Sequence, residues 1–287
     1  MGRSRLELSA GVSAGSVAAG LAVSRRVRPG VRCAGRALAV LLAVGGIAHA
    51  GEVTAVYDAY WAGLPAGKIR LTLDDSGGGY RDRIEIRTEG LPRLVTHFRG
   101  TAQADGRLAP GGPADPSRYD ARYDLHKRHD SRISMRFVEE GGATIAERGP
   151  RDTSHKPPLA ERFRRDAVDP MTAVERLRQE IAAGAADRDV SIPVYDGARR
   201  FDVIARLLPK QDQTDGQLRV ELTLRPIAGF KGESSDDGDP DDAPRPVAVT
   251  LSDDARLLPL SLRVRVFYLP LVVRLDHLCS GPAACRG

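Results

Sequence analysis

Cysteine and aromatic residues are scarce in this 287-residue chain, which has three cysteines, one tryptophan and an aromatic content of 5%. So few cysteines exclude a small scaffold held by many disulfides. The sequence also lacks a Gly-x-Ser-x-Gly nucleophile elbow, a phosphate-binding glycine loop and a nucleotide fingerprint. It therefore predicts neither an enzyme nor a cofactor.

An uncharged apolar run at residues 37–50 follows an arginine-rich stretch and predicts a secretory signal peptide. The run is too short to span a bilayer comfortably. It ends in Ala48-His49-Ala50, the small-x-small pattern that a signal peptidase cuts. We therefore expect cleavage between Ala50 and Gly51, a periplasmic location, and no membrane span after cleavage.

The stretch of chain ahead of the apolar run is longer than is usual in a signal peptide. An over-extended N-terminus explains them, with the true translation start at Val27 or Val31. A twin-arginine signal at Ser24-Arg25-Arg26 is the alternative. Either way, the sequence predicts a leader over residues 1–50 and a single β-rich domain over 51–287.

The leader also accounts for the basic character of the chain. Its removal leaves 36 basic and 37 acidic residues, although the full chain carries a formal charge of +5. Nucleic-acid binding needs a net basic face. The sequence therefore argues against a nucleic-acid partner.

Apolar residues alternate with polar ones along most of the mature chain, as in strands with one wet face. Gly, Pro or Asp clusters separate most of these segments, so we expect about ten strands. The clearest alternation covers residues 53–61, 69–73, 84–86, 119–125, 133–137, 201–205, 218–224, 247–251, 260–268 and 271–275.

One segment has helical periodicity instead. Asp169 is a good N-cap and Pro170 suits the first helical position, so we expect a helix over about 169–183. Its apolar stripe comprises Val174, Leu177 and Ile181. The polar residues that we expect to face away are Glu175, Arg176, Arg178, Gln179 and Glu180.

A single helix cannot cover ten one-sided strands, so the sheet must cover itself. The sequence predicts a mainly β fold, a large curled antiparallel sheet with one central helix. The sheet could form an open barrel or a sandwich. Few aromatics are available, so the enclosed face should be aliphatic and form either a packed core or the lining of an apolar cavity.

Three motifs resemble a family of secreted bacterial proteins, the domain-of-unknown-function family 3108. They are Tyr57-x-x-Tyr60-Trp61-Ala62-Gly63-Leu64-x-x-Gly67-Lys68-Ile69, Val168-Asp169-Pro170-Met171-Thr172-Ala173, and Val194-Tyr195-Asp196-Gly197-x-Arg199-Arg200-Phe201-Asp202. The resemblance implies an exported β-rich protein without an established activity. Its curled sheet is similar in outline to periplasmic lipoprotein carriers, an analogy of fold alone.

The first and third motifs also have a purely structural interpretation. Gly63 and Gly67 bracket a turn between two strands. Tyr195-Asp196-Gly197 is a favoured corner between strands at 190–195 and 199–206.

Two cysteines, Cys279 and Cys285, remain after cleavage. We expect them to form a disulfide that staples the C-terminal tail. A redox pair is the alternative, but five residues separate the two, not the two that tune thiol reactivity.

Two apparent metal motifs do not fit metal chemistry. His126 and His129 would point to opposite faces of a strand, so a solvated edge explains them better. Asp237, Asp239 and Asp241 resemble the start of a calcium loop, but the glycine and the twelfth-position ligand are missing, so we expect residues 233–242 to form a flexible acidic loop instead. No metal ligands are predicted.

We therefore expect a non-catalytic exported protein that binds an apolar ligand, such as a lipid, or an envelope protein partner. The alternative is an envelope hydrolase acting on cell-surface glycan or lipid, with residues that only the fold brings together. The residues expected to line the ligand space are Trp61, Leu71, Val174, Leu177, Phe201, Leu222 and Leu262.

Overall fold

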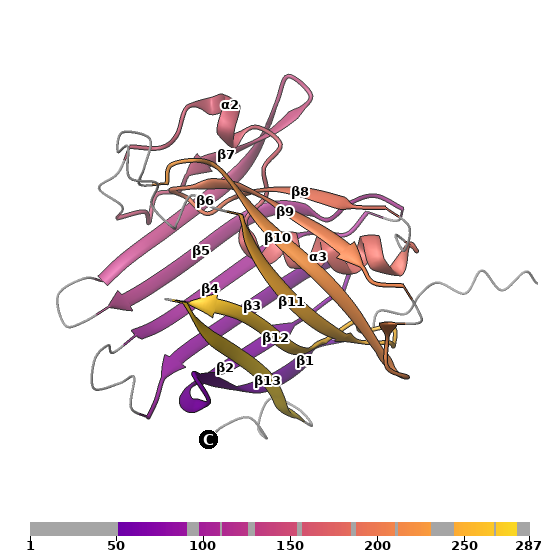
Figure 1. The fold of residues 1–287 in the computed structure, drawn as a ribbon. Helices are drawn as coiled ribbons and strands as arrows, with labels where there is room; N and C mark the ends of the chain where they lie inside the picture. The colour runs from indigo at the N-terminus through magenta and orange to yellow at the C-terminus, as the bar shows by residue number, and fades with distance from the viewer. Residues whose placement is uncertain are drawn as a thin grey trace, which may run out of the picture. The chain divides into compact units, whose positions relative to one another are not determined.

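The computed structural model in Figure 1 shows one large curled sheet around a single long helix. The residues that the structure describes are 51–90, 98–109, 111–125, 130–153, 157–184, 188–209, 212–230, 244–266 and 268–279. They contain thirteen strands and two helices. The elements are β1 (Val53–Trp61), β2 (Leu64–Leu73), β3 (Gly79–Thr88), β4 (Phe98–Arg107), β5 (Asp115–Leu125), β6 (Asp130–Glu140), β7 (Ala143–Arg148), α2 (Glu161–Arg164), α3 (Pro170–Ala182), β8 (Val190–Tyr195), β9 (Arg200–Leu207), β10 (Gln217–Ala228), β11 (Arg245–Ser252), β12 (Pro259–Val266) and β13 (Leu269–Cys279).

All thirteen strands belong to one antiparallel sheet, in the order β7-β6-β5-β4-β3-β2-β1-β13-β12-β11-β10-β9-β8. Each half is a simple meander, and the first strand pairs with the last, with Ala55 opposite Leu278. The sheet curls into a nearly closed barrel whose two edges are β7 and β8. This confirms the predicted mainly β fold with a curled antiparallel sheet and a central helix.

A four-residue segment connects the two edges. Arg165 forms an isolated antiparallel bridge with Ile145 of β7, and Val168 forms a parallel bridge with Val194 of β8. The Val168 N–H donates to Pro193 O at 2.9 Å. The segment therefore gives each edge a partner for part of its length, which matters because unpaired strand edges favour aggregation.

Helix α3 begins where the sequence predicts. The Asp169 carboxylate accepts hydrogen bonds from the backbone N–H groups of Met171 and Thr172, both at 2.9 Å, and Pro170 occupies the first turn. The helix ends at Ala182, and Gly184 follows with φ +82°. A left-handed glycine after the last turn is a common helix stop.

The predicted orientation of α3 is partly wrong. Leu177 and Ile181 are buried as expected, but Glu175 and Arg178, which should face away, are also buried, and Val174 is only half-buried. The reason is the position of the helix. It packs against β4 on one side and β8 and β9 on the other, so it has no fully wet face.

Helix α3 separates two apolar clusters, and Figure 1 shows it between the orange strands and the purple ones. The first cluster lies mainly on β1–β6 and includes Tyr80, Ala104 and Tyr119. The second lies mainly on β8–β11 and includes Val194 and Val220.

Strand β4 was not predicted. Apart from Phe98 at its start, its inward positions carry small residues, Gly100, Ala102, Ala104 and Gly106, so the apolar alternation that marks the other strands is missing. Helix α3 packs against this strand. Small side chains let the helix approach closely. Because they are not large apolar residues, they also leave no alternating pattern from which the strand could be predicted.

The predicted turn at Gly63 and Gly67 is displaced. The chain turns at Ala62 and Gly63, which have φ +50° and +82°, and Gly67 lies within β2. A Cβ on Gly67 would come within 2.3 Å of Arg87 O. Glycine at this position is explained by the close approach of β3 and not by a turn.

Candidate functional site

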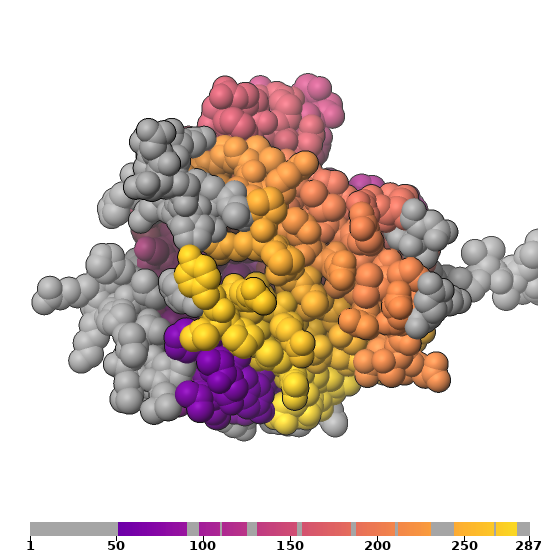
Figure 2. Space-filling model, in the orientation of Figure 1, coloured from indigo at the N-terminus to yellow at the C-terminus, as the bar shows by residue number. Residues whose placement is uncertain are grey.

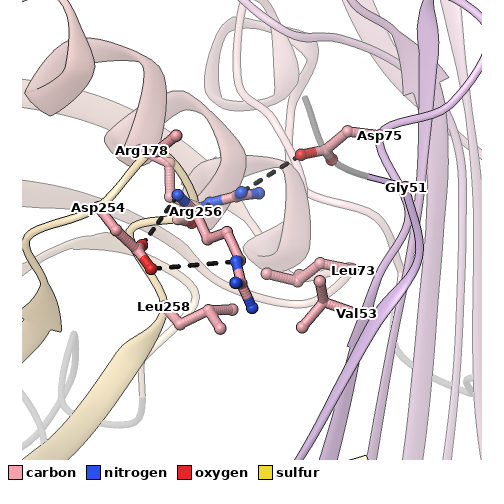
Figure 3. Close-up of a pocket in the computed structure, with 9 residues that line it drawn as sticks. Gly51, Val53, Leu73, Asp75, Arg178, Asp254, Arg256 and Leu258 are labelled. Carbon is pink, nitrogen blue, oxygen red and sulfur yellow. Dashed lines mark hydrogen bonds and ion pairs between the residues drawn. The ribbon is translucent and has the colours of Figure 1, made fainter. Parts of the chain in front are cut away.

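A cavity of about 210 Å³ lies at the end of the barrel that α3 occupies, hereafter the helix end (Figure 3). The connections β2–β3, β4–β5 and β11–β12 meet at this end. The residues that line the cavity are Gly51, Val53, Leu73, Asp75, Arg178, Asp254, Ala255, Arg256 and Leu258. Its wall is therefore mixed, with apolar residues of β1 and β2 facing charged residues of α3 and the loops.

Arg178 connects three parts of the fold at this cavity. Its Nη1 donates to Glu175 Oε2 at 2.5 Å and its Nη2 to Asp75 Oδ2 at 3.2 Å. Its Nε donates to Arg256 O at 3.0 Å. One guanidinium thus joins α3 to the β2–β3 turn and to the β11–β12 connection.

Asp82 of β3 lies beside this ion-pair network and is fully buried, with an exposed fraction of 0%. Neither of its carboxylate oxygens accepts a hydrogen bond of ordinary geometry from any residue that the structure describes. Burial, reinforced by the charges of Glu175 and Asp75, raises the pKa of Asp82 to about 8, and Arg178 and the Asp74 backbone offset part of the rise.

A second polar chain anchors the start of α3. The Tyr80 and Thr172 hydroxyl oxygens are 2.6 Å apart, and Thr172 Oγ1 donates to Asp169 Oδ2 at 2.5 Å. Burial raises the pKa of Asp169 to about 6, opposed by the hydrogen bonds from Thr172 and Met171. The barrel interior is therefore charged and polar where α3 faces β2 and β3, and aliphatic, as predicted, where α3 faces β8–β11.

The residues predicted to line a ligand space do not meet in one site. Leu71 belongs to the first apolar cluster and Leu177 to the second. Three more, Phe201, Leu222 and Leu262, are half-buried and pack against the second cluster. Trp61 and Val174 are half-buried and belong to neither cluster. None of the seven lines the cavity at the helix end.

Burial of the inward-facing residues decreases along the strands, away from α3. On β3, Tyr80 and Asp82 are buried, whereas Ile84 and Ile86 are half-buried. Strands β2 and β5 repeat the pattern, from Leu73 to Ile69 and from Tyr119 to Tyr123. Figure 2 shows the surface hollowed between the orange and the yellow strands.

The opposite end of the barrel, hereafter the far end, carries exposed apolar residues on two adjacent turns. Leu64, Tyr268 and Leu269 have exposed fractions of 49%, 84% and 41%. The turns lie side by side, because the Ala62 N–H donates to Pro270 O at 2.9 Å. Apolar surface of this kind marks candidate interaction sites when it is contiguous.

Several predicted features lie outside the described residues. These are the leader with Ala50, the pair His126 and His129, the acidic residues 233–242, and Cys285. Gly51 is exposed and lines the cavity, and Cys279 ends β13 opposite Thr54. Cleavage at Gly51 and pairing of Cys279 with Cys285 therefore remain predictions.

Asp75, Asp82 and Arg178 were not predicted as site residues from the sequence. Asp82 left a usable signal, because it takes the inward position between Tyr80 and Ile84 in an otherwise apolar alternation. A charged residue on the buried face of a strand indicates a paired or functional group. Asp75 left no such signal, since it lies in an acidic, glycine-rich turn typical of any hairpin.

Among the described residues, no helix has the length and apolar character needed to cross a membrane.

Comparison with known proteins agrees with this architecture. The fold is similar to a solved β-barrel-like protein of the domain of unknown function DUF1849 from Brucella abortus, with a TM-score of 0.50 and 14% sequence identity over 79% of this chain and 97% of that one. No curated protein matches the chain. The family model described as "Protein of unknown function (DUF3108)" matches residues 56–275, as the three motifs predicted. The chain belongs to the DUF3108 family.

Proposed function

We propose that this is an exported, non-catalytic protein of the periplasm that holds an apolar ligand against the inner face of its sheet near the far end. The observation that carries the proposal is the loss of burial along the strands away from α3. Inward-facing Leu222 and Leu262 are only half-buried, although apolar residues at such positions normally fill a core. A ligand with an acyl chain would cover them and gain about 25 cal/mol per Å² of buried apolar surface.

The exposed turns at the far end support the same proposal. Leu64, Tyr268 and Leu269 form an apolar and amphipathic patch on two neighbouring turns at this end of the barrel. Such a patch suits transfer of a ligand to or from an apolar donor. The same surface suits docking of an envelope protein equally well. Binding of such a protein partner is the second candidate function.

A hydrolase is less well supported. The acidic residues at the helix end form the nearest approach to a catalytic set. However, Asp82 does not line the cavity, and Asp75 and Glu175 are paired with Arg178. The other carboxylate that lines the cavity, Asp254, accepts hydrogen bonds from Ser252 Oγ at 2.8 Å and from the Arg256 N–H at 3.0 Å. Both cavity carboxylates, Asp75 and Asp254, are therefore engaged by other protein groups, whereas glycoside hydrolysis requires two that face the substrate.

Uptake of a fluorescent fatty-acid probe by the purified mature chain tests the proposal, together with lipid extraction after purification from the native host. Leu222→Trp and Leu262→Trp should each reduce probe uptake at least severalfold without unfolding the protein, because the larger ring occupies the ligand space. Ala248→Trp, on the exposed face of β11, is the matched control. A folded protein that carries no lipid and takes up no probe would overturn ligand binding and leave the partner-protein function.

A further inference from the structure

Three carboxylates converge beside the cavity at the helix end, each from a different element. Asp75 lies in the β2–β3 turn, Asp82 on β3 and Glu175 on α3. One carboxylate oxygen from each lies within 4.8 Å of the others. Oxygen ligands of Ca²⁺ lie 2.3–2.6 Å from the ion, so ligands on opposite sides of it are about 5 Å apart. The spacing is compatible with a shared cation.

The unsatisfied oxygens of this cluster provide a second, independent observation. Both oxygens of Asp82, and Oδ1 of Asp75, are buried and accept no hydrogen bond of ordinary geometry from the described residues. A buried carboxylate without a partner is costly, so native proteins pair such groups with a donor, a proton or a metal ion. The unsatisfied oxygens belong to the residues that converge.

The local charge also favours a cation. Three carboxylates face one guanidinium, that of Arg178, which already contacts Glu175 Oε2 and Asp75 Oδ2. With all three acids ionised, these three carboxylates and the guanidinium together carry a net charge of −2. A divalent ion would balance this charge and would use oxygens that Arg178 leaves available on Asp75 and Asp82.

We propose that Asp75, Asp82 and Glu175 bind a hard divalent cation, Ca²⁺ by preference, which enters through the cavity at Asp75 and fastens α3 to the β2–β3 hairpin. The ligands are all carboxylate oxygens, with no thiol or imidazole among them, which suits Ca²⁺ better than Zn²⁺. This site is at the opposite end of the barrel from the proposed apolar ligand, so each proposal can fail without the other.

The test uses the full mature chain, stripped with EDTA and then titrated with CaCl₂ while its melting temperature is followed. At a Ca²⁺ concentration 100 times the dissociation constant, the melting temperature should rise by roughly 5–10 °C. Tb³⁺ added in place of Ca²⁺ should give luminescence on excitation of tyrosine, because Tyr80 lies two residues from Asp82 on the same face of β3. Added Ca²⁺ should then displace it.

Asp82→Asn is the decisive variant, since Asp82 forms no ion pair with any residue that the structure describes. It should remove at least nine-tenths of the Ca²⁺-dependent shift. Asp74→Asn, which removes the same charge from the adjacent turn, should keep it. A combined Asp237→Asn, Asp239→Asn and Asp241→Asn variant should also keep it, which separates this site from the acidic segment 233–242.

Three results would overturn the proposal. They are a wild-type melting temperature that millimolar Ca²⁺, Mg²⁺ and Mn²⁺ all leave unchanged, a shift that Asp82→Asn retains, and a shift that the combined variant loses. If Asp82→Asn does not fold in EDTA, Asp75→Asn replaces it with the same expected loss.

Discussion

The two halves of the barrel pack α3 with different chemistry. The half formed by β1–β7 places alanines, tyrosines and the buried acids against the helix, as in Ala104, Tyr119 and Asp82. The half formed by β8–β13 places branched aliphatic residues there, such as Val194 and Val220. Every tyrosine in the two apolar clusters belongs to the first cluster, and all but Tyr195 of β8 lie on β1–β7.

This difference shows how one helix can fit inside a sheet that is open at an edge. On the first half, small residues of β4 let α3 lie close, and the contacts of Tyr80 with Thr172 and of Asp75 with Arg178 fix the position of the helix. On the second half, Arg178 also donates to Arg256 O, but most of the contact is apolar and provides burial without direction. The position of α3 is therefore set mainly by the first half, and much of the hydrophobic stabilisation comes from the second.

Loss of Arg178 should have the largest effect. Arg178→Met leaves the carboxylates of Glu175 and Asp75 buried without their guanidinium, so we expect a loss of about 3–5 kcal/mol in the free energy of unfolding. Arg188→Met is the control, because Arg188 pairs with Glu180 at the surface and its loss should cost less than about 1 kcal/mol. Urea denaturation measures both. Equal costs would contradict the role of Arg178.

The aliphatic half is tested by a pair of leucines. Leu177→Ala creates a cavity in the second cluster and should cost about 2–5 kcal/mol. Leu222→Ala removes a half-buried side chain nearer the far end and should cost less than about 2 kcal/mol, because solvent or ligand already contacts the site. Equal losses in thermal or urea unfolding would show that the far end is packed solid.

The close approach of α3 to β4 predicts that added bulk is harmful. Ala104→Leu should destabilise the fold by about 1–3 kcal/mol, since Ala104 is fully buried on the strand against which the helix packs. Ala248→Leu adds the same bulk at an exposed position of β11 and should be nearly neutral. Calorimetric melting of the two variants gives the comparison.

The buried N-cap predicts a dependence of stability on pH. The pKa of Asp169 is raised from 3.8 to about 6, so the folded state holds a proton that the unfolded state has lost between these values. Asp169 should therefore lower the free energy of unfolding as pH rises from about 4 to 6, by roughly 3 kcal/mol at most. Asp82, whose pKa is raised to about 8, adds a further fall over the same range and up to its own pKa. Asp169→Asn keeps a capping oxygen, so between pH 4 and 6 it should show a shallower fall than the wild type, with the part due to Asp82 remaining. Equal slopes in the two proteins would contradict the contribution of Asp169.

Much of the fold is predictable from period-two alternation and helix capping. Residues 53–61 and 218–224 alternate because one face is wet, and Asp169 with Pro170 marks the helix start by local chemistry alone. Strand β4 cannot be predicted in this way, because its contact with the helix requires small residues. The pairing of β1 with β13 cannot be predicted either, since nothing local in either strand specifies its partner.

The candidate site is harder to predict because it depends on contacts between distant residues. Asp75 and Arg178 are 103 positions apart in the sequence. From the sequence alone, Arg178 belongs to the polar face of an amphipathic helix, and only the structure shows that both sides of this helix are covered. Asp82 could be suspected from its inward position in β3. That Asp75, Glu175 and Arg178 lie beside it could not be predicted, because they come from other elements of the fold.

The pairing of the first strand with the last also constrains the order of assembly. Thr54 and Cys279 face each other across β1 and β13, so this seam cannot form until almost the whole chain is available. Contacts of such long range slow folding. For the export proposed above this delay is an advantage, because the barrel cannot close before the last strand has crossed the membrane. The same order makes loss of β13 severe, since it would expose the edges of both β1 and β12 to pairing with other chains.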